Sequence, residues 1–332
     1  MTGTTRKCCW MFTGQGSQWP GMAASIVNIS SHIEQRLAAA EQYFQDRRGV
    51  SLIDAIDSPD GDVNQTGITQ PALYVVECAL VDHWRSTLCS PAAVIGHSVG
   101  EYAAAYATGV FGFQDGLMLI EARGRLMQAL PSGGRMLAVK ASAQDLRDIL
   151  GPTLDEHATE LAIAAVNAPK QTVLSGAGAR VAQAAQTLKA KGYRSRELTV
   201  SHAFHSPLMA PMLTEFSSVA NRVRYAAPNI PFYSSLSAKQ VGDEIADPAY
   251  WVDHVSKAVL FCDTLRCLND VVVPDSYLEI GPNPILSGLA KRCLASDTDD
   301  DRKNNPRIVA SMSQKEDAAV SLESARGELV GK

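Results

Sequence analysis

The sequence predicts an α/β protein with a large domain that contains a parallel sheet and a smaller subdomain. Three observations predict this class. Short apolar runs alternate with helix-forming stretches along most of the 332 residues. The segment Gly96–Gly100 (GHSVG) joins an apolar run to a helix-forming run through a sharp turn flanked by glycines. Residues 132–200 follow the order β-α-β-β-α-β, which is typical of a ferredoxin-like subdomain.

The first part of the large domain is expected to occupy residues 1–131. Its elements are, in chain order, a strand at Cys8–Phe12, helices at Ser31–Arg47 and Pro71–Thr87, a strand at Ala92–Ile95, a helix from Glu101 and a helix near Phe113–Ala129. The side chain of Gln114 or Asp115 is expected to cap the last of these helices.

The inserted subdomain, residues 132–200, begins where Ser132-Gly133-Gly134 breaks the helical pattern. Its expected elements are a strand at Arg135–Val139, a helix at Ala143–Leu150, strands at Leu161–Val166 and Thr172–Ser175, a helix at Gly178–Lys191 and a strand at Tyr193–Val200. An insertion at this point places the residues that follow it at the edge of a cleft between two domains, where ligands commonly bind.

The large domain is expected to resume over residues 201–295, with a strand at Tyr277–Ile280 that ends in a Gly-Pro-Asn-Pro turn. Charged and amide side chains dominate residues 296–306, so this segment is expected to be a solvated loop. Residues 296–332 as a whole are expected to form a tail outside the domain.

Ser98 lies in the turn between strand and helix, where its hydroxyl and the amide of Val99 are expected to point at the same spot. Serine is a weak nucleophile unless a base takes its proton. Three of the seven histidines lie in polar, helix-like stretches, and the turn should direct the neighbouring His97 away from Ser98. The histidines that remain are His202, His205 and His254. No nearby Cys, Asp or Glu completes a metal-ligand set around them, so a base is favoured over a metal site, with polar loop histidines as the alternative.

Short motifs recur in a fixed order along nearly the whole chain. They are Phe12–Gln18 (FTGQGSQ), Thr69–Leu73 (TQPAL), Gly96–Glu101 (GHSVGE), Glu121–Gly124 (EARG), Val166–Pro169 (VNAP), His202–Ser206 (HAFHS), Tyr250-Trp251 and Glu279–Pro284 (EIGPNP). Each motif alone is weak, whereas the ordered set is specific. The sequence resembles the malonyl-CoA:acyl-carrier-protein transacylases and, more closely, the acyltransferase domains of polyketide synthases.

This resemblance implies an α/β-hydrolase-like large domain and a role for each matching residue. The subdomain is inserted within that large domain, because the family motifs resume at His202. Ser98 matches the nucleophile that carries the acyl group, and His205 matches the general base. The other matches are the oxyanion-hole amides of Gln15 and Val99, the carboxylate-binding Arg123, and Phe204 at a position associated with malonyl rather than methylmalonyl substrates. A backbone carbonyl orients the base in this family, and the motif around Tyr250-Trp251 assigns that carbonyl to His254.

Arg123 is the residue expected to select the substrate. A guanidinium meets a carboxylate with two parallel, charge-assisted hydrogen bonds, which suits the free end of a malonyl group. An acetyl group would leave the buried charge unpaired, at a cost on the order of 1–3 kcal/mol. The alternative is a surface arginine that pairs with Glu121 or Asp115 on the same helix.

Composition excludes several other classes of protein. A net charge of −5 argues against nucleic-acid binding, and no apolar run is long enough to span a membrane. Seven scattered cysteines without C-x-x-C spacing predict neither a disulfide framework nor a zinc site. Together with a polar start that does not resemble a secretory signal, they predict a cytoplasmic protein. No metal and no bound cofactor are expected.

The resemblance therefore implies transfer of a malonyl unit from malonyl-CoA to the phosphopantetheine thiol of an acyl carrier protein, in polyketide or fatty-acid-like biosynthesis. A ketosynthase and other synthase domains are its expected neighbours, because Ile308–Met312 and the tail after it resemble the linker that follows such acyltransferase domains. An excised synthase domain and a free-standing enzyme both remain open. Two alternative functions are a serine thioesterase or hydrolase, and a non-catalytic scaffold that docks carrier proteins.

Overall fold

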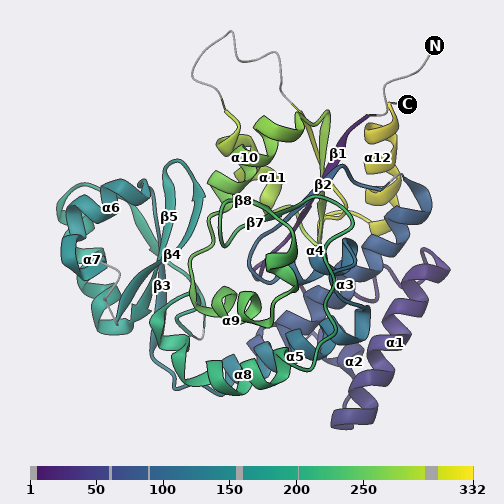
Figure 1. Ribbon diagram of the computed structural model, residues 1–332, viewed down its shortest axis with the longest axis horizontal. Helices are drawn as coiled ribbons and strands as arrows, with labels where there is room; N and C mark the ends of the chain where they lie inside the picture. The colour runs from purple at the N-terminus through teal and green to yellow at the C-terminus, as the bar shows by residue number, and fades with distance from the viewer. Residues whose placement is uncertain are drawn as a thin grey trace.

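The computed structural model describes residues 6–59, 62–88, 90–154, 160–200, 202–295 and 306–331. Within these residues the strands form two sheets, which lie side by side in Figure 1. The large sheet has the strand order β10-β9-β1-β2-β7-β8 and the small sheet the order β4-β5-β3-β6. The predicted α/β class with a separate antiparallel subdomain sheet is confirmed.

The large sheet consists of parallel strands with one antiparallel strand at its edge. Its strands are β1 (Cys8–Phe12), β2 (Ala93–Gly96), β7 (Phe232–Ser234), β8 (Lys239–Val241), β9 (Ser276–Ile280) and β10 (Arg307–Ala310). β8 is the antiparallel member and pairs with β7. The central strand β1 pairs with β2 on one side and with β9 on the other. In this register Trp10 lies opposite Val94 of β2 and Leu278 of β9.

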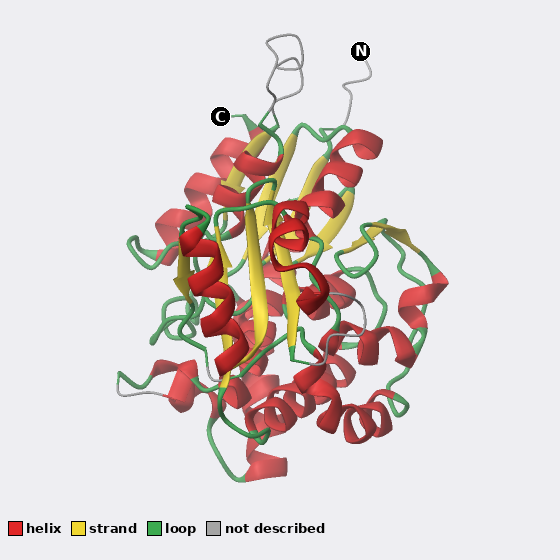
Figure 2. Cartoon of the chain, turned by 90° about the vertical axis from the view of Figure 1, so that its left-hand side faces the viewer, coloured by secondary structure: helices red, strands yellow, loops and turns green. Residues whose placement is uncertain are grey.

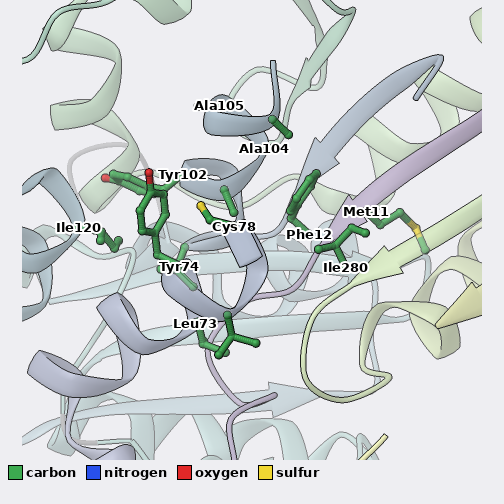
Figure 3. Close-up of a cluster of buried hydrophobic side chains, with 14 of the residues drawn as sticks. Met11, Phe12, Leu73, Tyr74, Cys78, Tyr102, Ala104, Ala105, Ile120 and Ile280 are labelled. Carbon is green, nitrogen blue, oxygen red and sulfur yellow. The ribbon is translucent and has the colours of Figure 1, made fainter. Parts of the chain in front are cut away.

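Helices cover both faces of the large sheet, which explains why its central strands are apolar throughout. The helices are α1 (Ser31–Arg48), α2 (Leu52–Asp57), α3 (Thr66–Thr87), α4 (Gly100–Ala107), α5 (Phe113–Gln128), α8 (Leu213–Ala220), α9 (Pro248–Ser256), α10 (Phe261–Val272), α11 (Leu286–Cys293) and α12 (Ala318–Val330). Figure 3 shows Phe12 and Ile280 of the sheet lying close to Leu73, Tyr74 and Cys78 of α3 in the core. This packing fixes the strand ends that carry the site.

The small sheet is antiparallel and has the predicted β-α-β-β-α-β order. It contains β3 (Gly134–Val139), β4 (Leu161–Ala168), β5 (Gln171–Ala177) and β6 (Ser195–Glu197), with helices α6 (Ala143–Leu150) and α7 (Gly178–Ala190). Both helices lie on the side of the sheet that faces away from the large sheet, and they stand in front of it in Figure 2. Leu146 of α6 and Val181, Ala184 and Leu188 of α7 complete a second hydrophobic core there.

Two expectations of the sequence are wrong here. α5 begins after Gly112, and no side chain caps its N-terminus, so neither Gln114 nor Asp115 has that role. The C-terminal tail is not separate from the large sheet, because β10 pairs in parallel with β9. The sheet therefore extends beyond the boundary expected at residue 295. The solvated loop expected at residues 296–306 lies, except for its last residue, outside the described residues.

Among the helices that the structure describes, none is both long enough and apolar enough to cross a lipid bilayer.

Candidate active site

Ser98 lies at the sharp turn between β2 and α4, in a backbone conformation that few residues with side chains adopt. Its φ is 51°, in the left-handed region. The glycines on either side are required by packing. A Cβ on Gly96 would lie 2.4 Å from the Glu101 nitrogen, and one on Gly100 would lie 2.4 Å from the Phe12 carbonyl oxygen. This close approach of helix and strand holds the serine hydroxyl out of the backbone.

His205 is the histidine that reaches Ser98. Its Nε2 lies 2.6 Å from the Ser98 Oγ, and its Nδ1 lies 2.8 Å from the carbonyl oxygen of Lys257. A carbonyl can only accept, so Nδ1 carries the hydrogen and the neutral ring presents the Nε2 lone pair to the serine hydroxyl. His205 also has a positive φ, 55°, so both partners of this hydrogen bond are held in strained backbone conformations.

The carbonyl that orients His205 belongs to Lys257, so the assignment to His254 is wrong. Helix α9 ends at Ser256, and Lys257 follows it with an extended backbone, φ −80° and ψ 159°. Its carbonyl lies beyond the helix and is free to turn towards the imidazole. His254 lies one turn earlier, buried beside His205, with ring centroids 6.1 Å apart. Burial lowers the pKa of His254 well below its ordinary value, so this ring is neutral too.

The environment of His205 keeps it in the form that accepts a proton. Burial, with the nearby positive charge of Arg123, lowers the pKa of His205 to about 3, against an ordinary value near 6.5. The hydrogen bond to Lys257 acts in the opposite direction but is outweighed. The imidazole is therefore neutral at pH 7 and able to take the Ser98 proton.

Arg123 lies on the inward face of α5 and is almost completely buried, with 2% of its surface exposed. Its guanidinium lies over the ring of Tyr102, 5.7 Å from the centroid, and its Nε has no hydrogen-bond partner. In the described chain it forms no ion pair. The alternative of a surface pair is wrong, because Glu121 pairs with Arg48 and Arg125, and Asp115 with Arg224. A buried cation without a carboxylate is costly, which makes this a place where an anionic ligand would be stabilised.

Ser98, His205 and Arg123 line one cavity of about 190 Å³ that lies between the two sheets. Gln15, Val99 and Phe204 line it as well, so every predicted site residue except His254 lines this cavity. The small sheet contributes apolar walls, including Met136, Ala164 and Val173. The arrangement is an apolar pocket with a nucleophile and base at one point and a positive charge at another.

The amides of Gln15 and Val99 are placed by two different elements. Val99 is the N-cap residue of α4, and the first N–H groups of a helix have no acceptor within the helix. Gln15 follows Gly14 in the loop after β1, and Gly14 packs closely on His97, where a Cβ would lie 2.8 Å from the His97 carbonyl oxygen. The loop after β1 therefore lies directly against the turn that carries Ser98.

Sequence reasoning missed other polar residues of this pocket. The His97 ring lines the cavity, where its Nε2 lies 2.7 Å from Oδ1 of Asn167 on β4, so this side chain links the large sheet to the small one. Gln70 of α3 also lines the cavity and leaves its Oε1 without a partner. The motifs GHSVG, VNAP and TQPAL contained these residues, but spacing alone did not show that they converge. His202 instead lies 3.0 Å from the carbonyl oxygen of Leu130, away from Ser98.

Comparison with known proteins identifies the family of this sequence over almost its full length. The family model of the acyl transferase domain matches residues 9–330. Polyketide synthase GfsB of Streptomyces halstedii is 38% identical over 294 residues, which are 86% of this chain and 5% of that protein. Conidial pigment polyketide synthase PfmaE of Pestalotiopsis fici is 33% identical over 299 residues, which are 88% of this chain and 14% of that protein. The chain thus spans only a small part of these curated relatives.

Solved structures agree with this relationship. The acyltransferase domain from the second module of the salinomycin polyketide synthase matches with a TM-score of 0.87 at 34% identity, over 97% of this chain and 72% of that one. An acyl carrier protein S-malonyltransferase from Vibrio cholerae matches with a TM-score of 0.81 at 28% identity, over 96% and 99% of the two chains. The motifs, the pocket and these matches establish that the chain belongs to the acyltransferase family, and that it is an acyltransferase of the polyketide synthase and malonyl-CoA:acyl-carrier-protein transacylase kind.

Proposed function

We propose that this acyltransferase moves a malonyl group from malonyl-CoA to the phosphopantetheine thiol of an acyl carrier protein, through an ester on Ser98. The observation that carries the proposal is the buried, unpaired guanidinium of Arg123 in the same cavity as the Ser98–His205 pair. A nucleophile and a fixed cation in one apolar pocket suit an acyl group with a negative charge at its far end.

Acylation begins when His205 Nε2 takes the Ser98 proton and the serine oxygen attacks the thioester carbonyl of malonyl-CoA. The carbonyl oxygen becomes an oxyanion, which accepts hydrogen bonds from the amides of Gln15 and Val99. Two fixed donors of this kind stabilise the transition state by several kcal/mol, and loss of one typically costs about 3 kcal/mol. The intermediate collapses, the C–S bond breaks, and CoA leaves with the proton from His205. The product is malonyl-Ser98.

Transfer repeats the chemistry in reverse with a different thiol. His205 takes the proton of the phosphopantetheine thiol, and the sulfur attacks the Ser98 ester. The second tetrahedral intermediate uses the same two amides. When the C–O bond breaks, the Ser98 oxygen recovers a proton from His205, and the malonyl thioester leaves on the carrier. The carbonyl of Lys257 holds the ring in one tautomer throughout, so Nε2 serves both half-reactions.

Arg123 contributes to both binding and reactivity. Its charge is one reason why the pKa of His205 is low. A malonyl carboxylate beside Arg123 offsets that charge, which restores basicity to His205 only when the correct acyl group is bound. Phe204, which also lines the cavity, is the residue we assign to the choice between malonyl and the bulkier methylmalonyl group. A difference of one methyl group is a weak basis for selection, typically about 1–3 kcal/mol.

The carrier protein and adjacent synthase domains such as a ketosynthase are the partners that this proposal requires. The cysteines that the structure describes are all free thiols, which supports a reducing, cytoplasmic setting.

The test is the intact mass of the protein after brief incubation with equal concentrations of malonyl-, methylmalonyl- and acetyl-CoA. We expect one malonyl-sized adduct that is absent from Ser98→Ala and that disappears when a phosphopantetheinylated carrier is added. A mixture of adducts would overturn the specificity and leave the transferase intact. Free CoA without an adduct would indicate a hydrolase, and neither CoA nor adduct would indicate a scaffold.

A further inference from the structure

A buried carboxyl group, that of Glu77, takes no part in the chemistry described above. Glu77 lies on α3 and is fully buried. Its Oε1 is 2.5 Å from the Thr13 hydroxyl oxygen, and its Oε2 has no hydrogen-bond partner. In the described chain Glu77 has no ion-pair partner, and the charged group that acts on it is another carboxylate, that of Glu279. Hydrogen bonds with Thr13 favour the ionised form of Glu77, but burial outweighs them and disfavours a negative charge here.

A chain of hydrogen bonds leads from Glu77 to the loop after β1. The Thr13 Oγ1 lies 3.0 Å from the Ser17 Oγ, which lies 3.0 Å from the carbonyl oxygen of Gly14. These three bonds in series need three hydrogens. The Gly14 carbonyl can only accept, so Ser17 donates to it, and Thr13 must then donate to Ser17. Each hydroxyl has one hydrogen, so the bond between Thr13 and Glu77 takes its hydrogen from the carboxyl group.

Two other buried glutamates show the opposite arrangement. Glu101 accepts hydrogen bonds from the amide and hydroxyl of Ser235 and from the Tyr250 hydroxyl. Glu279 accepts from the amides of residues 285–287 and from the Ser287 hydroxyl, at the start of α11. Several donors around each of these carboxyl groups favour the ionised form, although burial still raises the pKa of Glu279 and raises that of Glu101 to about 7. Glu77 has only Thr13 beside its carboxyl group, through one hydroxyl and the backbone, and its Oε2 has no hydrogen-bond partner in the described chain.

The Gly14 end of this series of hydrogen bonds determines the direction of the Gln15 amide. The carbonyl of Gly14 and the N–H of Gln15 belong to one planar trans peptide group, in which they point in opposite directions. The Gly14 carbonyl points to Ser17, so the Gln15 N–H points away from it. Gly14 also packs on His97, so this peptide group lies directly against the turn that carries Ser98.

We propose that Glu77 is held as a neutral carboxylic acid and is a positioning residue for acyl transfer, setting the direction of the Gln15 amide through Thr13 and Ser17. The inference rests on the proposed function for the role of that amide. Burial, with the Glu279 charge, raises the pKa of Glu77 well above its ordinary range, in agreement with the hydrogen count.

The test compares Glu77→Gln, Glu77→Leu and Ser17→Ala in the full chain. Gln can donate to Thr13 as the neutral acid does, so its acylation rate should stay within about twofold of wild type. Leu at 77 and Ala at 17 remove one link each. Both should slow single-turnover acylation of Ser98 by malonyl-CoA on the order of tenfold to a hundredfold, while the Kd for malonyl-CoA is unchanged. Thr108→Val is the matched control, because it removes a buried hydroxyl whose acceptors are carbonyls of α4, away from the pocket.

Infrared spectroscopy at pH 8 measures the protonation state directly. Wild type should show the C=O band of a protonated carboxyl group that is missing in Glu77→Gln. Absence of that band from wild type overturns the neutral acid. A Glu77→Leu enzyme that acylates at the wild-type rate, or a Glu77→Gln enzyme as slow as the leucine variant, overturns the positioning role. Should the leucine variant not fold, Ser17→Ala decides the same point with Glu77 in place.

Failure of the proposed function can be distinguished from failure of the Glu77 proposal. In that case wild type would not retain malonyl on Ser98, yet the infrared band of Glu77 would persist. The rate comparison would then be made with whichever acyl-CoA does acylate or is hydrolysed.

Discussion

Arg123 and Arg125 lie two positions apart on α5 and meet opposite environments. Arg123 is buried without a carboxylate, whereas Arg125 is 40% exposed and pairs with Glu121 and Glu215. Arginine is therefore a buried cation without a carboxylate partner at position 123 and part of an ordinary surface ion pair at position 125. Surface pairs contribute little to stability, typically about 0–1 kcal/mol, so only the first is expected to matter for the reaction.

Arg123→Ala should remove the preference for malonyl. We expect kcat/KM for malonyl-CoA to fall by roughly a hundredfold or more, since the substrate carboxylate loses its charged partner in a buried site. The value for acetyl-CoA should fall much less or rise, because an unpaired cation no longer lies in the pocket. Arg125→Ala is the control and should leave both values unchanged. Equal losses with the two substrates would contradict a carboxylate-binding role.

The roles of Ser98 and Arg123 could be predicted from the sequence because they depend on the type of side chain, and a sequence motif shows the type of side chain directly. The sequence also reduced the base to a few histidines, and the family resemblance favoured His205, which the structure places against Ser98. The Lys257 carbonyl was misassigned because every residue has a carbonyl, and only the end of α9 decides which one turns outwards. The state of Glu77 was hidden for a similar reason. A hydrogen count requires the partners, and those lie on a different element.

The turn between β2 and α4 is the element on which the proposed mechanism most directly depends. It forms because Gly96 and Gly100 let the helix approach the strands more closely than any side chain allows. Most elements before residue 200 were predicted to within a few residues, because their apolar periodicity is clear. Strand β6 is shorter than expected, three residues, and all three are exposed. The helices after residue 211 were not predicted individually, since short strands such as β7 and irregular turns separate them.

Gly100→Ala should disrupt this turn. The added methyl group would meet the carbonyl oxygens of Phe12 and Thr13, so we expect loss of Ser98 acylation together with a fall in stability of several kcal/mol. Gly327→Ala is the control, because the same substitution is expected to raise stability there. It lies inside α12 with open space at its Cβ position, and the change should stabilise the fold by about 0.5–1 kcal/mol. Thermal unfolding and the mass of the acylated protein measure both outcomes. A Gly100→Ala enzyme with normal acylation would show that the turn can relax.

At the scale of the molecule, the C-terminal segment completes the large sheet. β10 covers the edge of β9, α12 packs beside it, and the Ser311 hydroxyl accepts a hydrogen bond from the Trp84 indole of α3 while donating to the Glu279 carbonyl. The sequence resembled a linker here, and composition could not show that a linker-like segment pairs as a strand.

Ending the chain after residue 295 should therefore damage the whole fold. β9 would become an open, apolar edge, which is a template for aggregation. We expect soluble aggregates or precipitation in size-exclusion chromatography, where the full chain elutes as a discrete species. A truncated protein that remains discrete and still acylates Ser98 would show that β10 and α12 are dispensable.

The position of β1 also has a consequence for synthesis on the ribosome. This strand is made first, yet it lies between β2 and β9, so Cys9 pairs with Ala93 on one side and Tyr277 on the other. Until the last part of the chain has emerged, one edge of an entirely apolar strand waits without its neighbour. Parallel pairing between distant segments is slow because a large loop must close first. During translation the apolar β1 is therefore exposed to aggregation until β9 has been made, and only then can the sheet that supports the loop after β1 be complete.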